Sequence, residues 1–559
     1  MGPGFRRDDE DSARGEVKPI RDRAPIIPSP QGEGSDINAN VKHGDGFDRT
    51  LAFVAVALQL AGTAIFLADG FRDRISADAS VPLLLARRML ETGSLMPADW
   101  YYGNGDFWIV GPQLFVLPFV AAWGAVPRAL ACGNALGLAL LFFSALALAR
   151  AAGARWTTAL IAATLPVALY SHFQREFVVV QLSYGLMAAK LMLTLAAAIA
   201  WLRAPSSGRA ALIVYGVLLA VWTAENPGRP LAFLLLPLGV AIALHRAPAR
   251  RAGVLGAVTL VALASGWLVR QWLLMRLQMV PGLDAFRFTP PGEWMQHLRE
   301  VSGGMRHLYG LDALGDPVIP AFVATLLAVL RAAAFPAIGV LALRRSVPEA
   351  RTPLVVGAVG FVLVAALLVV GNVMVDPVSD RYLMPSWLLA ISGAVIAARA
   401  LPAWRWIAVL LVIAFPLGGV LNAIGIRDAG SATDAAGLPR PPAMDGAIAV
   451  LRETGLARGF ATHRYANVAT VRSEGAVELC DMHLQPTPAP ARWLDAAPCF
   501  DPARYANGFF VLLAPDERDA ANTGALSATL GAPDDVREAD GYAIWAYHAG
   551  NGNLAWLAR

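Results

Sequence analysis

The sequence predicts a polytopic α-helical membrane protein with a soluble α/β domain after its last apolar run. Three observations carry this prediction. Hydrophobic residues make up 56% and charged residues 16% of the 559 positions, whereas ordinary soluble domains hold about 25% charged residues. The apolar residues gather into runs of about 17–25, the length that a helix needs to cross a bilayer. After Leu421 the chain becomes polar and remains so to Arg559.

The first 45 residues are predicted to form a disordered cytoplasmic tail. They are rich in Arg, Asp, Gly and Pro and hold no apolar run, so they cannot bury a core. They also lack the short apolar segment of a cleaved signal peptide. The first span, from about Leu51 to Ala68, is therefore expected to be an uncleaved anchor. It opens a membrane domain over residues 46–425.

Twelve apolar segments follow one another in this membrane domain. The segment at 108–125 is short, opens with Gly111 and Pro112 and has Pro118 in its middle. We expect it to be re-entrant or to lie on the membrane surface. The others give about 11 full spans, at 51–69, 129–148, 156–172, 179–202, 210–225, 231–245, 253–275, 317–343, 353–372, 383–398 and 406–422.

Arginine placement sets the predicted orientation, because short cytoplasmic loops carry an excess of Lys and Arg. Five connections hold twelve arginines, and three of the four connections between them hold one each, namely Arg175, Arg229 and Arg381. The first set is expected in the cytoplasm and the second set outside. With 11 full spans and a cytoplasmic N-terminus, the C-terminal domain also lies outside. The alternative, an outside N-terminus, would require translocation of a long charged tail.

The first outer loop, at 70–107, is longer and more acidic than a linker between two spans needs to be. Its composition suggests a place that holds a polar substrate at the membrane surface. The aromatic rings at its end can stack on a sugar, or simply sit at the interface where Trp and Tyr gather. The carboxylates are Asp73, Asp78, Glu91, Asp99 and Asp106, and the aromatics are Trp100, Tyr101, Tyr102 and Trp108.

Asp78 is the strongest single candidate for a functional residue in this loop. Ser80 and Pro82 can start a helix that runs to Glu91 and stops at Gly93. One side of this helix is apolar and the other basic, so it is expected to lie along the membrane surface with Asp78 at its start. The alternative role of Asp78 is a helix cap, and the two roles can coexist.

Each short outer loop combines an arginine with an acid. A guanidinium matches a phosphate through two parallel hydrogen bonds. A carboxylate can accept a proton from a hydroxyl or hold a metal. These are the groups needed to move a sugar off a lipid phosphate, and local salt bridges at the loop ends are the alternative. Along the chain Arg175 precedes Glu176, Arg229 follows Glu225, and Arg381 stands between Asp380 and Tyr382.

Two further charged residues, Lys190 and Arg331, lie within predicted apolar spans. Charge inside the membrane is costly and usually faces the interior of the helix bundle. Both residues are expected too deep to touch a phosphate at the outer surface. A structural role, or contact with a lipid on the inner side, is predicted instead.

The C-terminal region, 426–559, is predicted to be a small α/β domain, since about 130 residues suffice for an independent core. Helices are expected at 444–453 and 516–530, and strands at 476–479, 509–513 and 542–547. Cys480 and Cys499 can form a disulfide if this domain lies outside the cytoplasm. Two free thiols are the alternative.

Four stretches of the sequence resemble the GT-C glycosyltransferases, which include lipid A aminoarabinose transferases, protein O-mannosyltransferases and oligosaccharyltransferases. The closest likeness is to bacterial members. An outer-loop Asp, a surface helix and a second acid about a hundred residues later form the shared pattern. The stretches are SADASVPLLLARRMLETG and DWYYGNGDFW in the first outer loop, RYLMP at 381–385 and GFATHRYANVATVRSEG at 459–475.

This resemblance implies a multi-pass enzyme of the bacterial inner membrane with its C-terminal domain in the periplasm. It implies a polyprenyl-phosphate sugar as donor, a glycan, lipid or protein as acceptor, and no nucleic acid partner. Asp78 would be the base and Glu176 the second acid, although many members have Asp there. No cofactor is certain, and a divalent metal is an open possibility. The residues expected to bind donor phosphate are Arg175, Arg229 and Arg381, and those expected to bind substrate are Trp100, Tyr101, Tyr102 and Tyr382.

Two other classes compete with this interpretation. A transporter or lipid flippase often has repeated halves and broken helices near mid-membrane, and the sequence shows no internal repeat. A noncatalytic assembly subunit is the second alternative. The large outer loop and the outer domain favour the enzyme, with the outer domain covering the active face and helping to select the acceptor.

Overall fold

The computed structural model describes residues 34–203, 208–280, 287–311, 321–374, 378–428 and 444–558. The described residues divide into two units, one that ends at Phe47 and one that begins at Asp48. Helix α1 spans Gly34–Ile65, so it starts before the tail boundary predicted at residue 45. The prediction for residues 1–33 lies outside the described residues.

Ten helices in the described ranges are long and apolar enough to cross a bilayer, which confirms the predicted polytopic class. In three of these spans a π-helical turn joins two shorter helices: α9 (Gly228–Pro230) to α10 (Leu236–His245), α13 (Ala321–Val329) to α14 (Phe335–Arg345), and α17 (Trp404–Val412) to α18 (Gly418–Asp428). The others are Gly46–Ala68, α4 (Pro127–Ala151), α7 (Ser183–Arg203), α8 (Gly208–Glu225), α11 (Ala249–Leu274), α15 (Pro348–Val370) and Ser379–Ala398, which contains α16 (Met384–Ala398).

Two predicted segments are shorter than a span. Helix α3, Pro112–Trp123, has 12 residues, or roughly 18 Å at 1.5 Å per residue, which fits the predicted re-entrant or surface segment. The segment at 156–172 was predicted to cross fully, and this is wrong in length. Helix α5 covers Trp156–Thr164 and a 3₁₀ turn containing Pro166 follows it. Because the backbone becomes extended at Ala168, the helix ends early, and the described residues hold ten long helices plus this shorter segment where 11 full spans were expected.

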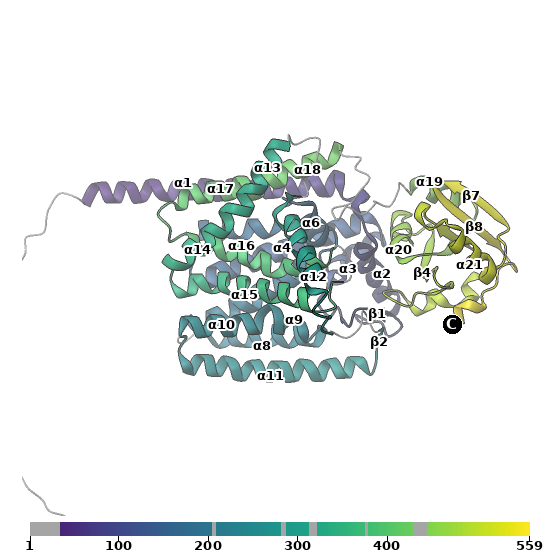
Figure 1. Ribbon diagram of the computed structural model, residues 1–559, viewed down its shortest axis with the longest axis horizontal. Coiled ribbons are helices and arrows are strands. Elements are labelled where there is room, and N and C mark those ends of the chain that lie inside the picture. The colour runs from purple at the N-terminus through teal and green to yellow at the C-terminus, as the bar shows by residue number, and fades with distance from the viewer. Residues whose placement is uncertain are drawn as a thin grey trace, which may run out of the picture. The chain divides into compact units, whose positions relative to one another are not determined.

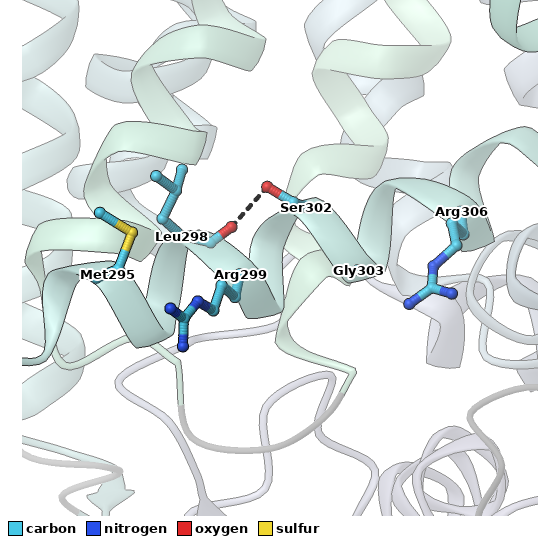
Figure 2. Close-up of a pocket in the computed structure, with 6 residues that line it drawn as sticks. All are labelled: Met295, Leu298, Arg299, Ser302, Gly303 and Arg306. Carbon is cyan, nitrogen blue, oxygen red and sulfur yellow. Dashed lines mark hydrogen bonds between the residues drawn. The ribbon is translucent and has the colours of Figure 1, made fainter.

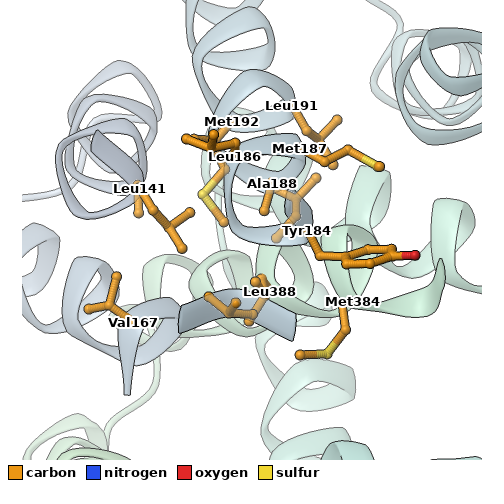
Figure 3. Packing of buried hydrophobic residues seen from close by; sticks show 14 of the residues in the cluster. Leu141, Val167, Tyr184, Leu186, Met187, Ala188, Leu191, Met192, Met384 and Leu388 are labelled. Atoms are coloured by element: carbon orange, nitrogen blue, oxygen red, sulfur yellow. The ribbon is translucent and has the colours of Figure 1, made fainter. Parts of the chain in front are cut away.

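Helix α7 lies at the centre of the helical packing. Figure 3 shows Leu186 and Met192 of α7 close to Leu141 of α4 and Leu388 of α16. Helices α15 and α16 approach each other more closely still. A Cβ on Gly357 would stand 2.5 Å from the backbone nitrogen of Ala390, so glycine permits this contact, as small residues do between membrane helices.

The helices at the edge of the bundle present apolar side chains outward. Helix α11 lies beside α8, and α10 beside α15, as Figure 1 shows. On α11 the side chains of Leu260, Val261 and Leu268 are each more than 60% exposed. Such a face is suited to contact with lipid chains and not with water.

The loop after the first span contains helix α2, Ala77–Thr92. It starts three residues before the Ser80 expected from sequence, because the side chain of Ser76 accepts a hydrogen bond from the amide of Ala79 at 3.4 Å and caps the helix. Gly93, in a left-handed conformation, ends it as predicted. The helix is not an exposed surface helix, since it packs against α3 on one side and α20 (His463–Arg472) on the other.

The C-terminal domain is built on a six-stranded mixed sheet with the order β5-β4-β3-β6-β8-β7. Strand β3 is parallel to β4 and β6, and α20 makes the crossover from β3 to β4. This confirms the predicted α/β domain. The strands are β3 (Arg458–Ala461), β4 (Glu478–His483), β5 (Ala489–Pro490), β6 (Gly508–Leu513), β7 (Asp535–Ala539) and β8 (Tyr542–His548), and the other helices are α19 (Asp445–Glu453) and α21 (Ala520–Leu530).

Cys480 of β4 and Cys499 are joined by a disulfide that is buried within this domain. Of the two alternatives left by the sequence, the bond is the one observed.

Replacing Cys480 and Cys499 together by alanine is expected to lower the free energy of unfolding of the C-terminal domain. In the chain-entropy picture, a loop of this size is worth about 3 kcal/mol. Denaturant unfolding of the purified protein measures the loss, with Cys132→Ala on α4 as the control. Alkylation of both cysteines in the native protein before any reductant is added would contradict the bond.

Candidate active site

Asp78 lies in the first turn of α2, where Ser76 already serves as the cap. Ser76, and not Asp78, therefore caps this helix. The Asp78 side chain is 53% exposed, and its Oδ1 lies 3.4 Å from Nε2 of His463 in the C-terminal domain. A helix N-terminus favours a negative charge, so the position suits an ionised carboxylate.

The charges around Asp78 favour its ionised form. Desolvation by the surrounding protein would raise the pKa of Asp78. The hydrogen bond and charge of His463, together with the charge of Arg381, outweigh this and lower the pKa. Asp78 is therefore an anion at neutral pH, although it stands next to an apolar helix bundle.

Arg381 lies in the 3₁₀ turn Ser379–Leu383 that leads into α16. Its Nε donates a hydrogen bond of 3.0 Å to the hydroxyl of Tyr184 at the start of α7. The guanidinium carbon lies 5.3 Å from the ring centre of Tyr382 and 5.8 Å from that of Phe177. These contacts on several sides hold one guanidinium near the Asp78 carboxylate.

Arg229, on α9, joins the same group of side chains. It forms an ion pair with Asp106 of the first outer loop, and Asn226 donates a hydrogen bond of 2.7 Å to the same carboxylate. The charge of Arg229 also acts on Tyr184 and on Tyr382. Asp78, Arg229, Arg381 and Tyr382 were all predicted from sequence, and the fold brings them together from three separate segments.

Two of the acids that stand near these arginines in the sequence contact other residues in the structure. Glu225, four residues before Arg229, instead pairs with Lys190 and accepts the Val110 amide at 2.7 Å. Asp380, next to Arg381, lies 3.2 Å from Nδ1 of His307 on α12 (Trp294–Tyr309). The pairs form across helices because side chains at a helix end point toward neighbouring helices.

Lys190 lies nearer to a helix end than its predicted span suggested, and it has the predicted structural role. Helix α7 begins at Ser183, so Lys190 is seven residues, or roughly 10 Å, from this end. It reaches Glu225 at the end of α8 and the backbone oxygen of Val110. Arg331 does have the expected structural role, since it donates to the carbonyls of Tyr309 and Ala414.

Arg175 and Glu176 occupy a π-helical turn, Arg175–Val180. Arg175 is 2% exposed, contacts His172 and Asn422, and lies over the ring of Phe66. Glu176 accepts a hydrogen bond from Gln181 at 3.2 Å. The roles assigned to Arg175 and Glu176 stay predictions.

The aromatic run at 100–102 packs against the C-terminal domain. Trp100 and Tyr102 are each 2% exposed, and Trp100 forms a β-bridge with Ala496. Tyr101 and Tyr102 form strand β1, parallel to β2 (Gln278–Met279). The ring of Tyr101 lies 6.1 Å from that of Phe500. Burial fits the packing alternative for these rings, and sugar stacking by them stays a prediction.

Sequence reasoning missed the residues that the C-terminal domain brings to Asp78. His463 starts α20, Asp481 lies on β4 with no solvent exposure, and their nearest side-chain atoms are 2.5 Å apart. The ring of Trp493 lies 4.6 Å from that of His463. The sequence signal that could have found His463 is its position between a short apolar stretch and a helix. Such a position marks the carboxyl end of a parallel strand, where binding sites often form.

Helix α12 carries a second cationic surface. Its outer face has a shallow hollow of about 430 Å³ lined by Met295, Leu298, Arg299, Ser302, Gly303 and Arg306. Figure 2 shows the side chains of Arg299 and Arg306 extending the same way, while Ser302 donates to the carbonyl of Leu298. The next residue after Arg306, His307, lies against Asp380, which links this helix to the turn that carries Arg381.

Among the described residues, one group of three metal-ligating side chains is close enough to hold an ion: Cys480, Asp495 and Cys499. Both sulfurs are used in the disulfide, so the group offers one carboxylate and does not fit a metal. The divalent metal considered from sequence stays a prediction.

Two solved structures align with most of the chain. ArnT from Cupriavidus metallidurans in the apo state has a TM-score of 0.50 at 13% identity, covering 88% of this chain and 97% of its own. The same protein bound to undecaprenyl phosphate has a TM-score of 0.50 at 14% identity, covering 90% and 98%. The chain has the GT-C fold. No protein-family model and no curated protein matches the sequence, so the likeness establishes the fold alone.

The buried Lys190–Glu225 ion pair joins α7 to α8 beside the site. Lys190→Met is expected to destabilise the protein by about 3–5 kcal/mol, because it leaves a carboxylate buried without its cation. The double variant Lys190→Met, Glu225→Leu should recover part of this loss. Thermal unfolding midpoints of the purified protein measure both, with the exposed Arg344→Met as control. A Lys190→Met variant as stable as the wild type would show that the ion pair is not a fixed contact.

Proposed function

We propose that the protein is a membrane glycosyltransferase of the GT-C type. It transfers a sugar from a polyprenyl-phosphate donor to a hydroxyl or amine of a glycan, lipid or protein acceptor. The observation that carries the proposal is the convergence of an ionised carboxylate, Asp78, with the guanidinium of Arg381. A fold neighbour in complex with undecaprenyl phosphate adds independent support.

In the proposed reaction Asp78 is the base. An acceptor hydroxyl loses its proton to the Asp78 carboxylate, and the acceptor oxygen forms a bond to the anomeric carbon of the sugar. The bond from that carbon to the phosphate oxygen breaks, and polyprenyl phosphate leaves. Arg381 and Arg229 stabilise the negative charge of the leaving phosphate, which a planar guanidinium matches well.

The same proposal gives Tyr382 a place beside the sugar, since its ring stands next to the guanidinium of Arg381. Tyr184, whose hydroxyl accepts from Arg381, would hold that arginine in position. Arg175 and Glu176 remain secondary candidates, for donor phosphate and for acid–base work respectively.

We place the enzyme in the bacterial inner membrane, with Asp78 and the C-terminal domain on the periplasmic side. The twelve arginines in alternate connections support this orientation, and so does the disulfide, because such bonds persist in oxidising compartments. Thiol labelling in intact cells tests it. Cys480 and Cys499 should be protected until a reductant that does not cross the membrane is added.

Asp78→Asn should lower turnover by about 10²–10⁴-fold, the usual contribution of a general base. The assay follows release of undecaprenyl phosphate by mass spectrometry from a panel of undecaprenyl-phosphate pentoses and hexoses, with bacterial envelope glycolipid as acceptor. Glu91→Gln, near the far end of the same helix, is the matched control. Full turnover by Asp78→Asn at normal expression would overturn the mechanism, and donor movement without release of undecaprenyl phosphate would favour a flippase.

Arg381→Ala should raise the KM for the donor more than it lowers kcat, because the arginine contacts the phosphate in the bound donor as well as in the transition state. Arg344→Ala, an exposed arginine at the end of α14, is the control. A donor KM equal to that of the wild type would exclude Arg381 from the phosphate site. Treatment with a chelator removes any divalent metal, so it tests whether a metal or the arginines supply the positive charge at the phosphate. Turnover that survives chelation assigns that charge to the arginines.

A further inference from the structure

Two segments distant in sequence meet at Asp78. His463 and Asp78 are 385 positions apart, yet Nε2 of one lies 3.4 Å from Oδ1 of the other. The other ring nitrogen of His463, Nδ1, lies 2.5 Å from Oδ2 of Asp481. The imidazole therefore stands between two carboxylates, one from the loop after the first span and one from the sheet of the C-terminal domain.

The fold of the C-terminal domain fixes this histidine. Residue Ala461, at the end of β3, is paired in register with Asp481 on the parallel strand β4. His463 follows Thr462, the cap of α20, so both side chains lie at the carboxyl ends of neighbouring parallel strands. Asn467, one turn along α20, adds a contact of 3.4 Å to Nδ1 of His463. The ring of Trp493 covers one side of the imidazole.

Contacts around the pair hold the two segments together. Arg472, at the end of α20, forms a 3.0 Å ion pair with Asp73, just before α2. Arg87 of α2 forms a 2.8 Å ion pair with Glu478 of β4. The amide of Tyr101 donates to the carbonyl of Asp495 at 2.9 Å. The N-termini of α2 and α20 are thus held together by several contacts spread over the interface.

The charge state of His463 excludes a role as a base. Burial alone would lower the pKa of His463, but the charges and hydrogen bonds of Asp481 and Asp78 raise it to about 10. The ring is therefore an imidazolium at neutral pH and cannot take the acceptor proton. It can donate one hydrogen bond to each carboxylate, as only the protonated ring does.

We propose that His463, held by Asp481, is a positioning residue that keeps the Asp78 carboxylate ionised and oriented, so that the C-terminal domain completes the active site. This proposal rests on the proposed function, in which Asp78 is the base. The sequence predicted that the C-terminal domain covers the active face and helps to select the acceptor. Under this proposal the domain also contributes to catalysis.

The charged groups that face this pair determine the expected pH dependence. His463 from α20 and Arg381 from the turn before α16 face Asp78, and both lower its pKa. Asp481 is faced by His463, by His483 on the same strand and by Asp78. Asp495 accepts a hydrogen bond from the Asp481 amide, and burial, together with the charge of Asp481, raises the pKa of Asp495.

His463→Ala removes one of the two groups that keep the pKa of Asp78 low, so this pKa rises. The acidic limb of the kcat/KM profile should then move to higher pH, because Asp78 must be ionised to act. The loss in kcat at neutral pH should be about 10- to 100-fold, as expected for a hydrogen bond to a charged group. The KM for the donor should change little, since His463 acts through Asp78.

Asp481→Asn should alter the alkaline limb of the kcat/KM profile. With its carboxylate partner gone, the pKa of His463 falls, so the imidazolium is lost at a lower pH than in the wild type. Activity should therefore decline on the alkaline side at lower pH, and this limb should be absent in His463→Ala. His548→Gln, at the end of β8, is the control for both variants and should keep the wild-type profile.

Imidazole in solution tests whether the missing side chain, and not a damaged fold, explains the lower activity of His463→Ala. It should restore part of the turnover of His463→Ala and none of that of Asp78→Asn. Wild-type kcat and an unmoved acidic limb in His463→Ala would overturn the positioning role, as would an inactive but folded variant that imidazole does not rescue. If His463→Ala fails to fold, the alkaline limb of Asp481→Asn decides. Full activity of Asp78→Asn would instead overturn the proposed function itself.

Discussion

The contact between the first outer loop and the C-terminal domain is the constraint on which the site depends. Asp78 is placed by the cap of α2, but its ionised state and direction also depend on His463 from the other side of the interface. Ion pairs and backbone hydrogen bonds spread over the interface keep α2 and α20 in register. The position and the charge state of the Asp78 carboxylate therefore depend on both the membrane part and the sheet domain.

Ion pairs with buried carboxylates hold the membrane side of the same site. Lys190 with Glu225 and Arg229 with Asp106 each join two segments at the end of the helix bundle. Breaking a buried pair costs more than never forming it, so these pairs specify one arrangement of helix ends. Arg381 is held differently, by the hydroxyl of Tyr184 and by aromatic rings. The charge of Arg381 helps to lower the pKa of Asp78 and, in the proposed reaction, stabilises the leaving phosphate.

Much of the fold followed from the sequence because long apolar runs and strong helix signals are local. Asp78, Arg381 and Tyr382 were found because polar residues stand out between such runs. The short helix α5 was overestimated, since an apolar run continues past the turn at Pro166 where the helix ends. The partners of Asp106, Glu225 and Asp78 could not be predicted, because they lie 123, 35 and 385 positions away. His463 was visible only as one residue in a stretch that resembles GT-C glycosyltransferases.

The most direct test of glycosyl transfer is the identity of the lipid that the protein retains. Native mass spectrometry of the wild type and of Asp78→Asn, purified from the same cells, measures this. If Asp78 is the base, the wild type should hold discharged polyprenyl phosphate, while Asp78→Asn should accumulate the polyprenyl-phosphate sugar. The mass difference between the two lipids would also identify the sugar. The same sugar-loaded fraction in both proteins, or a bound lipid without a polyprenyl phosphate, would contradict the account.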